Sequence, residues 1–182
     1  MTTTEPLITA EYLLQAQGLG RCELVRGELI MMSPAGSEHG LITTNIHGPL
    51  WSYVSRTGLG RVFGAETGFH IAHNPDTVRA PDVAFVTTDR FPSPLPRGFF
   101  PGPPDLAVEV ISPDDRESQV QAKVQNWLDA GCQVVWLVDP RRQTVRVYQR
   151  GGEGHVLGLS DTLLGDPLLP GFSLAVAEIF KI

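Results

Sequence analysis

The spacing of apolar residues changes along the chain and predicts an alternation of helices and strands. Apolar residues recur at helical spacing in two long segments, 37–58 and 112–130. Runs that alternate or are wholly apolar, as in strands, cover residues 22–32, 61–86, 104–111 and 133–149. A short helix with Thr9 as N-cap and Gly18 at its end precedes them, and residues 168–182 predict an edge strand followed by a short closing helix.

Turn residues divide the strand-like runs into hairpins. Arg26 and Gly27 separate the first two strands, residues 74–76 form the turn of a second hairpin within 61–86, and residues 140–142 form a third. Pro49 should kink or interrupt the first long helix. Residues 91–104 contain six prolines and two glycines, so we expect a long stiff loop whose phenylalanines pack it against the protein.

Length and charge restrict the class of protein. A chain of 182 residues that is 42% hydrophobic is long enough to bury one core, so we expect a single domain over residues 1–182. The net charge is −6 and the sequence pI is about 5.3, whereas a general nucleic-acid binder usually has a domain pI above about 9. Any contact with DNA must therefore come from a local patch.

Cysteine usage and the N-terminal residues indicate a soluble, cytoplasmic protein. Cys22 and Cys132 do not form a disulfide framework, and neither lies at metal-ligand spacing from other cysteines or histidines. The N-terminus lacks a basic region and carries Glu5 and Glu11, which is unlike a signal peptide. No apolar run approaches the roughly 20 residues that span a bilayer.

Three residues stand out as candidates for chemistry. Glu109 lies inside an apolar strand, where a carboxylate is costly unless it is paired or bound to a metal. Asp82 begins another apolar strand, and Lys123 follows on the next helix. Twelve of the 14 basic residues are arginine, and Lys181 is the only other lysine. A retained lysine suggests a position that needs a compact charge.

Two strand carboxylates and a lysine can support phosphodiester hydrolysis. Magnesium is usually held by one or two carboxylates together with water and substrate oxygens. Structural alternatives remain: Asp82 as a strand-start carboxylate, and Glu109 in an ion pair with Lys123. Glu38, in the first turn of the long helix, is expected to interact with the helix dipole. His70 and His73 are interpreted as exposed strand-end residues rather than zinc ligands.

Six stretches, taken in order, resemble the Uma-two (Uma2) family of "putative restriction endonucleases", within the PD-(D/E)xK nuclease superfamily. They are CELVRGELIMMSP, EHGLITTNI, RAPDVAFV, PDLAVEVISP, KVQNWLDAG and VVWLVDPRRQTVRVY, and the resemblance extends from about residue 9 to 182. It implies an α/β (α+β) fold with a central mixed β-sheet flanked by helices and extra hairpins near both ends. It also implies a Mg²⁺-dependent nuclease site, with Mn²⁺ as a substitute, in which Asp82 and Glu109 bind the metal.

The chain departs from the superfamily motif at one position. The motif lysine would fall at Ile111, and Lys123 on the following helix matches the lysine that this family has displaced. The resemblance further implies that the Val110 carbonyl binds the metal and that Glu38 is a possible additional acid. The expected activity is hydrolysis of DNA with water as the nucleophile. A homodimer would place one site on each strand of a duplex.

Other functions remain open from the residues alone. A nuclease-like binding module without efficient turnover would agree with the acidic net charge, because phosphate binding relies on Lys and Arg. A glycosidase would use Asp82 and Glu109 as its carboxylate pair but needs a cleft lined with aromatic residues. Nothing in the sequence distinguishes DNA from RNA.

Overall fold

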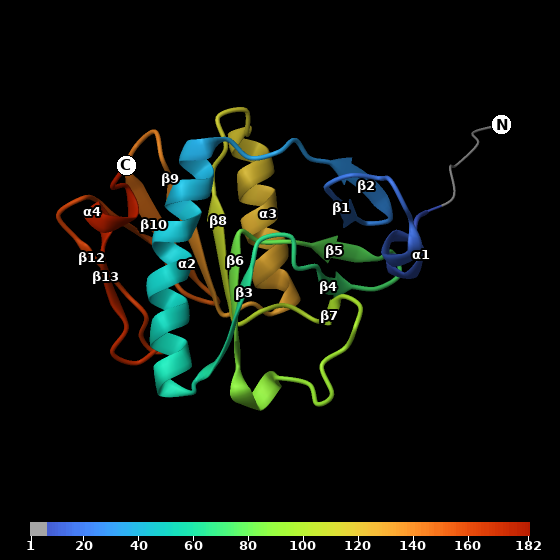
Figure 1. The fold of residues 1–182 in the computed structure, drawn as a ribbon. Helices are drawn as coiled ribbons and strands as arrows, with labels where there is room; N and C mark the ends of the chain where they lie inside the picture. The colour runs from blue at the N-terminus through green and yellow to red at the C-terminus, as the bar shows by residue number, and fades with distance from the viewer. Residues whose placement is uncertain (1–6) are drawn as a thin grey trace.

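A central mixed sheet of six strands forms the body of the protein (Figure 1). The structure is a computed structural model that describes residues 7–182; residues 1–6, including Glu5, lie outside the described residues. The strand order is β11-β10-β9-β8-β6-β3. The strands are β3 (Gly60–Gly64), β6 (Val83–Thr87), β8 (Leu106–Val110), β9 (Val134–Asp139), β10 (Thr144–Gln149) and β11 (His155–Leu157). Only the β8–β9 pair is parallel, and the predicted mixed sheet is confirmed.

Two long helices cover opposite faces of this sheet. They are α2 (Ser37–Thr57) and α3 (Glu117–Ala130). The apolar side chains of α2 pack with Val83 and Phe85 of β6, whereas those of α3 pack with Ala84 and Val86 of the same strand. Because successive strand residues point to opposite faces, this alternation assigns one helix to each side.

A second sheet of five short strands lies beside α3, away from α2 (Figure 1). Its order is β2-β1-β5-β4-β7. The strands are β1 (Cys22–Val25), β2 (Glu28–Met31), β4 (Phe69–Ala72), β5 (Thr77–Arg79) and β7 (Phe100–Pro101). Its own core contains three buried residues, Ala10, Leu24 and Val78. The N-terminal hairpin across Arg26 and Gly27 is confirmed.

The prediction of one hairpin over residues 61–86 was wrong in its extent. Only β4 and β5 form that hairpin, while β3 and β6 pair with each other in the central sheet. Alternation reports which residues share a face of a strand, but it does not report which strand is the partner.

Two helix boundaries differ from the predicted ones, and α2 is not interrupted at Pro49. α3 begins at Glu117 rather than at Ser112, because Ser112 N–H donates to the Asp115 carboxylate in a local turn. α2 continues through Pro49 without a break, since its apolar face is buried in the core on both sides of the proline. α1 (Ala10–Gln15) ends before Gly18, although its predicted N-cap Thr9 does accept the Tyr12 N–H.

The remaining segments cover the edges of the two sheets. The proline-rich loop follows the short helix η1 (Thr88–Arg90) and contributes β7 to an edge of the second sheet, where a proline is tolerated. Its Phe100 is buried, as predicted. Near the C-terminus, β12 (Thr162–Leu164) pairs with β13 (Ser173–Ala175), and α4 (Val176–Ile179) follows.

Within the part of the chain that the structure describes, no helix is both long and apolar enough to cross a membrane.

Candidate active site

Asp82 and Glu109 lie at the same end of two neighbouring strands. Asp82 directly precedes β6, and Glu109 is the penultimate residue of the antiparallel strand β8. Asp82 N–H donates to the Val108 carbonyl (3.0 Å), and Val110 N–H donates to Asp82 Oδ2 (2.8 Å). Both acids are buried. Antiparallel pairing therefore brings together two carboxylates that are 27 residues apart in sequence.

Lys123 of α3 reaches the Glu109 carboxylate. Its Nζ lies 2.8 Å from Glu109 Oε2, and the indole Nε1–H of Trp127 donates to Oε1 (2.8 Å). Glu109 faces α3 because it alternates along β8 with Val108 and Val110, which face α2. Trp127, one helical turn beyond Lys123, thus helps to fix the orientation of the Glu109 carboxylate.

A third buried carboxylate, Glu23 of β1, joins the site from the second sheet. Its Oε1 lies 3.3 Å from Lys123 Nζ and accepts the Ala80 N–H (3.0 Å), while its Oε2 pairs with Arg79 (2.7 Å). Sequence reasoning missed Glu23. The signal that identified Glu109, a carboxylate inside a short apolar strand, was also present here in CELV.

His39, at the start of α2, contacts the opposite side of Asp82. Its Nε2 lies 3.3 Å from Asp82 Oδ2 and 3.1 Å from the Val110 carbonyl oxygen. Both neighbours are acceptors, so we assign the proton to Nε2. The adjacent Glu38 is exposed in the first turn of α2 and forms no ion pair among those found in residues 7–182. The structure therefore brings His39, rather than Glu38, to Asp82.

The charges of the cluster do not balance around Glu109. Asp82, Glu23 and Glu109 share two close cations, Lys123 and Arg79; Arg21 is more distant, at 3.8 Å from Asp82. Burial raises the pKa of Glu109 to about 7, against the opposing charge of Lys123 and with the repulsion of the other two acids. The short contact to Lys123 does not reverse this shift, because burial outweighs it.

The three charged neighbours of Glu109, namely Asp82, Glu23 and Lys123, stay ionised. Burial alone would raise the pKa of Asp82, but His39 and Val110 N–H lower it below its ordinary value. Lys123 and Arg79 likewise outweigh burial and lower the pKa of Glu23. Burial opposes the charge of Lys123, but Glu109 and Glu23 raise its pKa above the ordinary value. Lys123 is therefore a permanent cation rather than a proton acceptor.

Asp105, at the other end of β8, is a buried acid whose carboxylate oxygens all accept hydrogen bonds. It is fully buried immediately before β8, and its oxygens accept hydrogen bonds from Thr87, Arg90 and Gln133. Although burial opposes it, these donors lower the pKa of Asp105. By comparison, the pKa of Glu109 is raised although Lys123 lies 2.8 Å away, and strongly shifted pKa values cluster at functional sites.

The raised pKa of Glu109 predicts a pH-dependent stability. The folded protein binds this proton more tightly than the unfolded chain, so the stabilisation is complete below pH 4.5 and lost as the pH rises towards about 7. Glu109→Gln imitates the protonated acid and keeps an acceptor for Trp127. In urea unfolding, we expect the variant to gain stability relative to wild type between pH 5 and pH 8. A difference that does not change with pH would contradict the shift, and exposed Glu117→Gln is the control.

The donors fit a small hard cation. Asp82, Glu109 and the second lone pair of the Val110 carbonyl offer oxygen ligands of the kind that Mg²⁺ prefers. A divalent ion would add positive charge beside the buried carboxylates. These three residues are the ones that would hold it.

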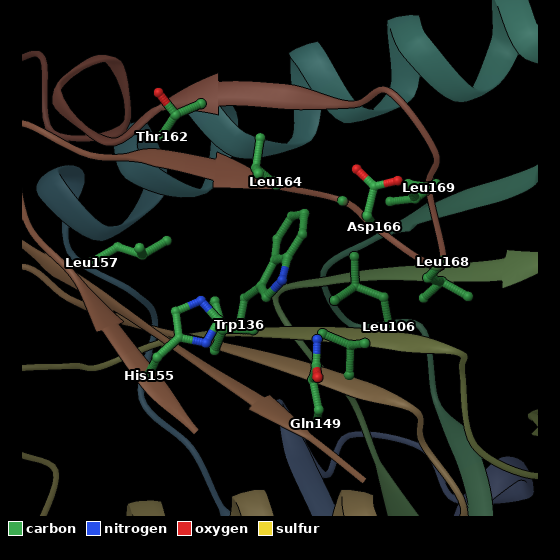
Figure 2. A pocket seen from close by; sticks show the side chains of 13 residues that line it. Leu106, Trp136, Gln149, His155, Leu157, Thr162, Leu164, Asp166, Leu168 and Leu169 are labelled. Carbon is green, nitrogen blue, oxygen red and sulfur yellow. The ribbon is translucent and has the colours of Figure 1, made fainter. Parts of the chain in front are cut away.

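An apolar cavity lies away from these residues (Figure 2). A cavity of about 260 Å³ lies between the central sheet and the β12–β13 hairpin, lined by residues such as Trp136, His155 and Leu164. None of the residues Asp82, Glu109 and Lys123 lines this cavity. The carboxylates are thus not at the base of this cavity.

Comparisons with known proteins identify the family and the fold of the chain. The family model of Uma2, described as "Putative restriction endonuclease", matches residues 9–177. A crystal structure of "a putative nuclease belonging to DUF820" from Anabaena variabilis ATCC 29413 has the same fold, with a TM-score of 0.83. It is 24% identical, and the match covers 95% of this chain and 97% of that one. Among curated proteins, none matches the chain.

Proposed function

Because the chain belongs to the Uma2 family, we propose that it is a Mg²⁺-dependent endonuclease that hydrolyses phosphodiester bonds of DNA. In this reaction the oxygen of a water molecule forms a new bond to phosphorus as the bond to the leaving oxygen of the backbone breaks. The attacking water gives up a proton to solvent, and the leaving oxygen takes one up from solvent, so the protons balance. We propose Asp82, Glu109 and the Val110 carbonyl as metal ligands and Lys123 as the assisting cation.

One observation carries this proposal: two carboxylates from adjacent strands and a lysine from the next helix meet at one end of the central sheet. The contacts are the Val110–Asp82 hydrogen bond and the 2.8 Å pair between Lys123 and Glu109. A structural ion pair alone would explain Lys123 and Glu109. It would not explain why a second carboxylate is buried beside them with a raised pKa at Glu109.

Each residue contributes a separate task. When bound, the metal ion would supply positive charge for the scissile phosphate and lower the pKa of a water molecule. His39 and Val110 N–H hold Asp82 in its ionised form, and Trp127 holds one oxygen of Glu109. Lys123 keeps a positive charge beside Glu109 in a water-poor site, where it stabilises negative charge that develops on the phosphate. Its raised pKa makes it a poor base.

The proposed substrate is duplex DNA and the proposed assembly is a homodimer. Two sites related by a twofold axis would cut both strands. Sedimentation with and without a duplex oligonucleotide tests the dimer.

Metal titration tests the site before any DNA sequence is known. We expect Mn²⁺ to bind wild type in calorimetric titration and to bind Asp82→Asn and Glu109→Gln much more weakly. The affinity should fall by more than the roughly 10–100-fold that an outer-shell change costs, since a ligand is lost. Asp89→Asn, at an exposed acid, is the matched control and should bind as wild type does.

Unchanged binding in both site variants would refute the assignment of these carboxylates. If the protein retains DNA in a salt-sensitive way without metal-dependent products, it is a nuclease-like binding module instead.

A further inference from the structure

The turn between β4 and β5 gathers three potential metal ligands that the proposed nuclease reaction does not use. His70 belongs to β4, and His73 and Asp76 belong to the turn. One ligand atom from each lies within 4.8 Å of the other two. This turn is at the opposite end of β5 from Arg79, the residue that pairs with Glu23.

The interatomic distances match the geometry of a tetrahedral ion. Zinc bonds to nitrogen and oxygen are about 2.0–2.1 Å long, so two ligands of a tetrahedral ion lie about 3.3 Å apart. The separation between His70 Nε2 and Asp76 Oδ1 is 3.3 Å, and that between His73 Nδ1 and Asp76 Oδ1 is 3.9 Å. The two imidazole rings are already side by side, with centroids 4.0 Å apart.

His70 contributes a buried nitrogen with no hydrogen-bond partner among residues 7–182. Its Nε2 is close to Asp76 Oδ1 but lacks hydrogen-bond geometry towards it. A buried polar atom without a partner costs free energy, and such atoms are uncommon in folded proteins. A bound ion is one explanation for this nitrogen.

The carboxylate of Asp76 is held in place from its other side. Ala10 N–H donates to Asp76 Oδ2 (2.8 Å), and the Asp76 carbonyl accepts the Gly27 N–H (2.8 Å). The hydrogen bond from Ala10 lowers the pKa of Asp76, so the carboxylate is charged at neutral pH. Oδ1 is left facing the two imidazoles.

We propose that His70, His73 and Asp76 form a second metal site, which binds a divalent transition ion of the Zn²⁺ class. Two imidazoles and one carboxylate suit Zn²⁺ or Co²⁺, whereas Mg²⁺ prefers oxygen ligands. The side chain of His73 is 71% exposed, so the ion has a route from solvent and an open fourth position. Of the two histidines that were interpreted as exposed strand-end residues, His73 is exposed and His70 is only partly so, and Asp76 lies three residues after His73.

The bound ion would act as a structural clamp. Asp76 already joins the β4–β5 turn to α1 and to the β1–β2 turn through its hydrogen bonds. An ion on its other oxygen would attach both histidines to the same point. This clamp lies in the second sheet, whose core is small, so occupancy would stabilise the part of the protein that carries Glu23.

Competition with a chromophoric chelator tests the site directly. We expect the wild-type protein to withdraw one equivalent of Zn²⁺ from the chelator, and Co²⁺ to give the visible absorption of a tetrahedral site. His73→Ala should weaken Zn²⁺ binding by more than about 10–100-fold, and Asp76→Asn should do the same while its amide oxygen still accepts the Ala10 N–H. His155→Ala, at an exposed histidine, should bind as wild type does.

Asp82→Asn separates this site from the carboxylates of the nuclease site. Retention of the Zn²⁺ equivalent in Asp82→Asn, together with its loss in His73→Ala, supports the second site. Equal affinity in His73→Ala and His155→Ala overturns it, as does the absence of Zn²⁺ binding to wild type.

Discussion

Asp82→Asn is expected to reduce metal-dependent DNA cleavage by about 10³-fold. A catalytic metal ion stabilises developing charge by several kcal/mol, and about 4 kcal/mol corresponds to about 10³-fold in rate. The substitution removes the negative charge but retains an oxygen that can accept the Val110 N–H, so the fold should be preserved. Cleavage of long heterogeneous duplex DNA with Mg²⁺ or Mn²⁺, followed under single-turnover conditions, measures the effect.

The comparison depends on variants that leave the site intact. Asp89→Asn should cleave at the wild-type rate, and circular dichroism should show the same fold in all three proteins. If purified Asp82→Asn cleaves DNA as fast as wild type, Asp82 is not a ligand of a catalytic metal and the proposed function is wrong for this site.

Lys123→Met is expected to destabilise the metal-free protein by about 3–5 kcal/mol at pH 8.5, because it removes the shared partner of two buried carboxylates. The effect should shrink at pH 6. There Glu109, whose pKa is about 7 even beside Lys123, takes up a proton and no longer needs a cation. Urea unfolding at the two pH values measures the difference. In the variant, Glu23 still pairs with Arg79, whereas Glu109 loses its ion pair with Lys123.

A double-mutant cycle isolates this interaction. Adding Glu109→Gln to Lys123→Met should restore most of the lost stability at pH 8.5, since the uncompensated charge is gone. Lys181→Met is the matched control: Lys181 is 72% exposed and pairs with Glu178 only at 3.4 Å, so its loss should cost little. An equal loss of stability at pH 6 and pH 8.5 would contradict the assigned titration of Glu109.

Local patterns were enough to bring Asp82, Glu109 and Lys123 together. Glu109 interrupts an apolar strand, Asp82 directly precedes another, and Lys123 lies at helical spacing from Val120 and Trp127 on the face towards the sheet. Burial of such residues requires partners, and the structure supplies them from one another. The central sheet, the two long helices and the N-terminal hairpin were predictable for the same reason, since periodicity reflects which face is buried.

The rest of the site depends on pairings between distant segments. Arg79 and Glu23 are 56 residues apart, and His39 and Val110 are 71 residues apart. Periodicity in β1 indicates a buried face but not that β5 lies beside it, and β5 in turn brings Arg79 to Glu23. For the same reason, the sequence did not predict that residues 61–86 are divided between the two sheets. Apolar and polar residues alternate throughout this segment, whichever strand each part pairs with.

The position of Glu23 has a consequence for how the protein loses activity. Lys123 and Glu109 belong to the central sheet and its helix, with an extensive core, whereas Glu23 and Arg79 come from β1 and β5, whose buried apolar residues form a small separate cluster with Ala10. Partial opening of a protein begins where few apolar contacts hold it. The β1–β2–β5 part of the second sheet should therefore open in a sub-global step, which releases Glu23 while the central sheet stays protected from hydrogen exchange. On heating, inactivation would then precede cooperative unfolding.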